Sequence, residues 1–149
     1  MTTYQNIIDR LTSICERHKF VNSYRVGDIY DVNFDDENKS PIYPYIHIIP
    51  QPSTLSRNEL LLSFSLLSMD LVDEDEKIET EVLSDTLQIL QDIIGEFLVG
   101  EDYPQFEISL PLALTPFTER FSNSLSGWNA EIQISIIQPL DACITPIEN

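Results

Sequence analysis

The chain has 149 residues, of which 42% are hydrophobic, and this is enough apolar material for one folded domain with a sizeable core. Eight lysines and arginines against 25 aspartates and glutamates give a formal net charge of −17. Binding to nucleic-acid phosphates needs clustered cations, so the composition argues against a protein that binds nucleic acid or anionic membranes tightly.

The first predicted element is a helix that ends near Phe20. Its apolar positions follow the spacing of one helical face: Tyr4, Ile7, Ile8, Leu11, Ile14, Cys15 and His18. Thr2 and Gln5 fit a capping box at its start. We interpret Cys15 as a small buried apolar side chain and His18 as a half-buried histidine near the helix C-terminus.

Three strands are expected next. Residues 24–34 alternate between apolar and polar, with an interruption at Gly27, and they are predicted to form a hairpin with residues 43–49. Residues 58–72 form the longest candidate strand. Its apolar parity flips after Leu66, which indicates a β-bulge, and its length predicts that it projects beyond the domain body.

A long helix is predicted from about residue 78 to residue 98, with a broad apolar arc and Gly100 as its stop. Four acidic residues come just before it, where the positive end of a helix favours negative charge: Asp73, Glu74, Asp75 and Glu76. Residues 58–149 hold only two basic residues, Lys77 and Arg120, against eighteen acids. We therefore expect the four residues to belong to an acidic surface.

Two more strands are expected at residues 106–112 and 130–136, joined by a long connection over residues 114–128. These elements predict an α+β fold in which a mainly antiparallel sheet of about five strands is packed by the N-terminal helix and the long central helix. The expected order is α-β-β-β-α-β-β. Residues 1–139 are predicted to be a single domain and residues 140–149 a C-terminal tail.

The connection carries an unusual group in which two phenylalanines flank an arginine: Phe117, Glu119, Arg120 and Phe121. In one interpretation, the phenylalanines fasten the connection to the sheet and Arg120 pairs with a local carboxylate. In the other, the four residues form a contact with a neighbouring subunit, in which Arg120 meets an acid across the interface.

Motifs for catalysis, metals and cofactors are missing from the sequence. The four glycines form no phosphate-binding loop, and there is no GxSxG motif. His18 and His47 lie on separate predicted elements, and Cys15 and Cys143 lack metal-ligand spacing. We therefore expect no enzymatic activity, metal or cofactor. The sequence begins without a secretory leader and has no apolar run of transmembrane length, so we expect synthesis in the cytosol and no membrane partner.

Several segments follow the order and pattern of a known family: Gly27-Asp28-Ile29-Tyr30-Asp31-Val32, Tyr43-Pro44-Tyr45-Ile46-His47, Met69-Asp70-Leu71-Val72 running into Leu83-Ser84-Asp85-Thr86-Leu87, and Leu114-Thr115-Pro116-Phe117-Thr118-Glu119-Arg120-Phe121 through Gly127-Trp128. With these segments the chain resembles the small connector proteins of tailed-bacteriophage tails, of the tail-terminator or tail-completion type. It is especially similar to ring proteins from crAss-like phages.

The resemblance implies a structural virion protein without enzymatic activity, located in the virion and in the host cytoplasm during assembly. It implies a homo-oligomeric ring of six or twelve copies in the head–tail connector or tail, beside the portal or neighbouring tail rings. Acidic side chains around the DNA channel would let the genome slide without sticking. Two alternatives remain: an acidic DNA-mimic inhibitor of a host DNA-binding protein, and an adaptor or chaperone for another virion protein.

Overall fold

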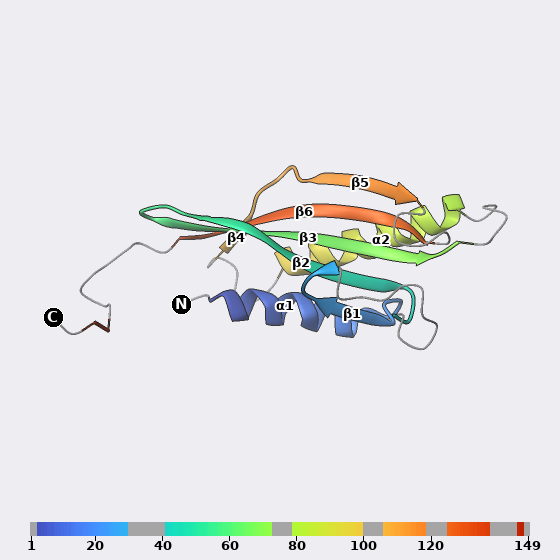
Figure 1. Cartoon of the computed structure of the whole chain (residues 1–149), viewed down its shortest axis with the longest axis horizontal. Helices are drawn as coiled ribbons and strands as arrows, with labels where there is room; N and C mark the ends of the chain where they lie inside the picture. Colours follow the sequence, from blue (N-terminus) through green and yellow to red (C-terminus); the bar gives the residue numbers. More distant parts are fainter. Residues whose placement is uncertain are drawn as a thin grey trace.

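The computed structural model describes residues 3–29, 41–72, 79–99, 106–118, 125–137 and 146–147. Its elements (Figure 1) are α1 (Tyr4–Arg17), β1 (Ser23–Val26), β2 (Tyr45–Leu55), β3 (Glu59–Leu71), α2 (Glu79–Leu98), β4 (Phe106–Ile108), β5 (Ala113–Thr118) and β6 (Leu125–Ile137). The predicted α+β class and element order are confirmed, with β5 as an added strand. Apart from residues 146–147, the predicted C-terminal tail lies outside the described residues.

The strands form one sheet in the order β1-β2-β3-β6-β4, with β5 paired to β6. β3 and β6 are antiparallel along their whole length, from the pair Glu59 and Ile137 to the pair Leu71 and Leu125. The other edge of β6 is shared by β4 and β5, both antiparallel to it. The long β3–β6 pair is therefore the centre of the sheet, and the sheet is mainly antiparallel, as predicted.

The predicted hairpin between the first two strands is wrong, because β1 runs parallel to β2, with Ser23 opposite Tyr45 and Val26 opposite Ile48. β1 ends at Val26, and the next residue, Gly27, has a φ of +136°, a conformation that side-chain-bearing residues rarely adopt. Its amide donates to the carbonyl of Ile48 (3.0 Å). The glycine turns the chain out of the strand. Residues 30–34 of the predicted strand lie outside the described residues.

The predicted bulge in the long strand is also wrong. β3 pairs with β6 without a shift, and the register irregularity lies in β2, between Gln51 and Thr54. The parity flip in β3 has a different cause. The helix-facing side of the strand is buried before the flip, and its outer side is buried after it. Phe64 and Leu66 pack on the helix side of the sheet, whereas Leu67 packs on the opposite, outer face. The predicted projection is confirmed, since the β2–β3 hairpin extends past the helices (Figure 1).

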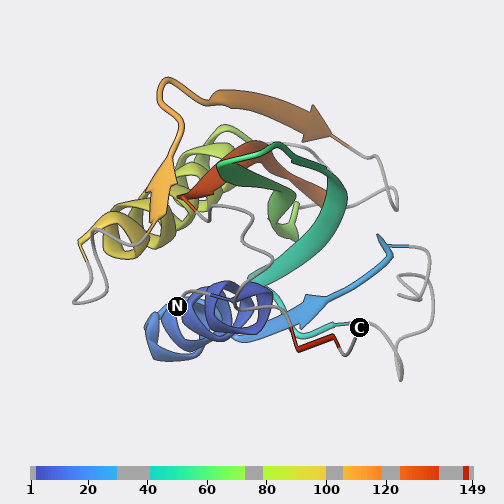
Figure 2. The same ribbon diagram turned by 90° about the vertical axis from the view of Figure 1, so that its left-hand side faces the viewer.

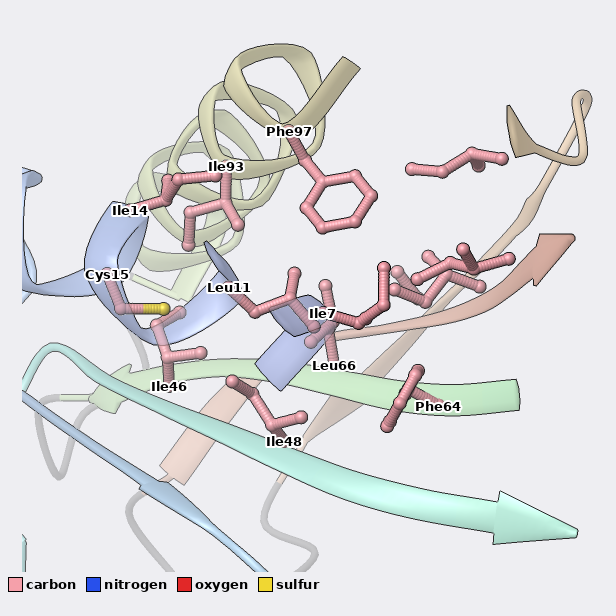
Figure 3. Close-up of a cluster of buried hydrophobic side chains, with 14 of the residues drawn as sticks. Ile7, Leu11, Ile14, Cys15, Ile46, Ile48, Phe64, Leu66, Ile93 and Phe97 are labelled. Carbon is pink, nitrogen blue, oxygen red and sulfur yellow. The ribbon is translucent and has the colours of Figure 1, made fainter. Parts of the chain in front are cut away.

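Both helices lie on the same side of the sheet, and the strands curve around them (Figure 2). Ile7 and Leu11 of α1 lie between Phe97 of α2 and the sheet residues Ile46 and Leu66 (Figure 3). This arrangement explains the helical periodicities, because each helix buries one apolar face against the strands and against the other helix.

Two predicted α1 residues are confirmed. Cys15 is fully buried, and burial raises its pKa to about 12, so it acts as an apolar side chain. His18 is half-buried, and its Nε2 lies 3.0 Å from the Asp92 carboxylate on α2. The predicted capping box is placed one residue too early: Thr3 is the N-cap, and it exchanges hydrogen bonds with Asn6.

Candidate assembly interface

Phe117, the first residue of the predicted subunit contact, lies in β5, opposite Gly127 of β6. Its side chain is 8% exposed and belongs to a cluster on the outer face of the sheet that also contains Tyr45, Leu67 and Met69. Phe117 therefore fastens β5 to its own sheet. The other three residues of the predicted contact, Glu119, Arg120 and Phe121, lie outside the described residues.

The sequence-based predictions give His47 no role, although a histidine in an otherwise apolar strand indicates a buried side chain that needs hydrogen-bond partners. It is 2% exposed, and its Nε2 donates to the carbonyl oxygen of Gly27 (2.8 Å), because a carbonyl can only accept. Its Nδ1 accepts from the hydroxyl of Tyr45, whose pKa is raised by burial. Both ring nitrogens are occupied and shielded, so the histidine fixes the turn at Gly27 and has no access to a substrate.

The four residues of the predicted acidic surface, Asp73, Glu74, Asp75 and Glu76, lie outside the described residues. The described residues nearest to them in sequence are nevertheless rich in acids. We use the name "acidic end" for the place where the end of β3 meets the first turns of α2, and it consists of Asp70, Glu81 and Asp85.

Asp70 of the acidic end lies near enough to Asp85 on α2 for the two charges to interact. Burial raises the pKa of Asp70, the Leu71 amide that donates to its Oδ1 (2.7 Å) lowers it, and the negative charge of Asp85 raises it again. Glu81 and Asp85 are exposed and one helical turn apart, so they share a side of α2. Like charges at this spacing repel each other, and a cation from outside would relieve the repulsion.

The second surface lies at the opposite end of the molecule. We use the name "arm" for residues 51–61, the projecting turn of the β2–β3 hairpin, which β6 supports along one side (Figure 1). All of residues 51–58 are exposed. Leu55 is 62% exposed, and Arg57 near the tip is also exposed.

Hydrogen bonds hold the arm in shape without apolar packing at its tip. The Ser56 amide and hydroxyl both donate to the carbonyl of Glu59, at 2.8 and 3.1 Å. Across the bulge, the Ser53 hydroxyl accepts from the Ser63 amide (3.3 Å), and Gln51 donates to the hydroxyl of Ser65 (3.1 Å). The arm is therefore preorganised, which lowers the entropy lost when such a surface binds a partner.

Among the described residues, no group of three or more histidine, cysteine, aspartate or glutamate side chains is arranged to hold a metal ion. Neither described helix has the length and apolar character needed to span a bilayer. No protein-family model and no curated protein matches the sequence. Within the described part of the chain, the features that stand out are two dissimilar surfaces, the arm and the acidic end, at opposite ends of the sheet.

Proposed function

We propose that the chain is a structural subunit of a ring in the head–tail connector or tail of a tailed bacteriophage. The observation that carries this proposal is the arm, a preorganised hairpin that is exposed over residues 51–58 and extends past the helices of its own subunit. An exposed arm at one end and a different surface at the other suit head-to-tail association. Such heterologous contacts close into rings when the rotation between copies is right.

The charge of the chain supports the same function. A net charge of −17 keeps free subunits apart in solution and repels the phosphates of DNA. A ring built from such subunits would surround the genome without holding it, which a channel for DNA requires. In this proposal the chain contributes geometry and surface charge, and it catalyses no reaction.

The proposal predicts that the protein is a fixed component of the virion. Quantitative mass spectrometry of purified particles of the encoding phage is expected to find the chain in six or twelve copies per particle, measured against the portal protein as an internal standard. If the chain is abundant in infected cells but absent from purified particles, the proposal is wrong, and an assembly chaperone or an inhibitor of a host protein takes its place.

A further inference from the structure

We propose that the arm of one copy docks against the acidic end of the next copy, with Arg57 facing the carboxylates. This inference rests on the proposed ring and identifies the contact that would build it. It commits to one occupant for the arm, a second copy of this chain.

The exposure of the arm leaves it accessible to a partner outside its own subunit. Leu55 is 62% exposed near the tip. The partner does not extend the sheet as an added strand, because Pro50 and Pro52 lie on the open edge of β2 and lack the amide hydrogens that strand addition needs. The tip and its side chains are therefore the surface that a partner would meet.

Charge favours an acidic partner. Arg57 is exposed and takes part in none of the ion pairs of the described residues. The acidic end has the complementary composition, because Asp70 at the end of β3 and Glu81 and Asp85 on α2 are all carboxylates. From residue 58 onward, the described part of the chain contains no basic residue. An arginine from outside would therefore find several carboxylates and, among the described residues from 58 onward, no basic side chain that competes for them.

The shape of the molecule keeps Arg57 away from the acidic end of its own copy, so a contact between them joins two copies. The tip of the β2–β3 hairpin lies at one end of the longest axis, and the end of β3 and the start of α2 lie at the other (Figure 1). A subunit cannot reach its own acidic end with its own arm. The contact is consequently heterologous, with the arm on one side and the acidic end on the other, as ring closure requires.

Charge reversal tests this contact. We expect Arg57→Glu to weaken assembly at least tenfold in sedimentation velocity, whereas Lys19→Glu, an equal change at an exposed site after α1, should assemble like the wild type. Adding Asp85→Arg to Arg57→Glu should restore assembly, because it exchanges the two charges. Wild-type assembly by Arg57→Glu, or equal weakening by Lys19→Glu, would overturn the contact.

A cross-linking experiment separates failure of the contact from failure of the ring. Ser56→Cys and Glu81→Cys chains, each also carrying Cys143→Ser, are mixed and oxidised, with Lys19→Cys replacing Glu81→Cys as the matched control. We expect disulfide-linked dimers in the first mixture well above the control. Rings without this cross-link would overturn the docking and leave the ring proposal standing, whereas the cross-link in chains that never close into rings would overturn the ring and leave the docking.

Discussion

Gly127→Ala is expected to destabilise the protein by roughly 3 kcal/mol or more, because overpacking against backbone has no easy relief. A Cβ atom at this position would lie 1.8 Å from the carbonyl oxygen of Ser68 and 2.9 Å from the Cα of Met69. Both are main-chain atoms of β3, the strand paired with β6 along its whole length. The two central strands would have to separate, and urea denaturation followed by circular dichroism measures the loss.

Gly95→Ala is the matched control, since Gly95 lies inside α2 and an added Cβ would meet nothing within 4 Å. Alanine in a helix is favoured over glycine, so this variant should be more stable than the wild type by about 0.5–1 kcal/mol. The same substitution is thus expected to act in opposite directions at the two sites. If Gly127→Ala unfolds at the wild-type urea concentration, the close approach of β3 and β6 is wrong.

Phe97→Ala is expected to cost about 3–5 kcal/mol, the range for removing a buried aromatic ring. Phe97 is 1% exposed, and its ring lies 4.9 Å from the ring of Phe106. The guanidinium of Arg10 lies over both rings, at 5.2 and 5.3 Å, and it also donates to the carbonyl oxygen of Phe97 (2.9 and 3.2 Å). The Arg10 side chain of α1 therefore contacts both α2 and β4.

The control for this loss is Phe20→Ala, because Phe20 is 68% exposed. A surface substitution of this kind is expected to change the free energy of unfolding by less than about 0.5 kcal/mol. Thermal denaturation of the two variants at the same pH compares them directly. Equal destabilisation by both variants would contradict the position of Phe97 in the core.

The helices could be predicted from the sequence because their signal is local. A helix facing one core repeats its apolar residues every three or four positions, and the burial of Cys15 and the position of His18 follow from that repeat. The length of β3 could also be predicted, and with it the projection of this strand beyond the helices. These features depend on residues close together in the chain.

The parts that could not be predicted depend on pairing between distant segments. The apolar alternation does not record whether β1 pairs with β2 in the parallel or the antiparallel direction. The prediction places the residues of β5 in a long connection, whereas they pair with β6 on one side only, where an edge strand accepts Pro116.

The candidate interface was only partly visible in the sequence. The excess of acids after residue 58 predicts an acidic surface, but Phe117 packs on its own sheet. The relation between the arm and the acidic end depends on the direction of β3, which separates Arg57 from Asp70 by the length of the strand. The sequence places these residues only thirteen positions apart and does not show that they lie at opposite ends of the molecule.

Native mass spectrometry of the purified chain, over a range of concentrations and with neighbouring connector proteins added, tests the ring most directly. The account predicts one discrete closed assembly, six or twelve times the 17.1 kDa mass of the chain, without intermediates at saturation. A chain that stays monomeric under all of these conditions, or that instead forms a one-to-one complex with a host DNA-binding protein, would contradict it.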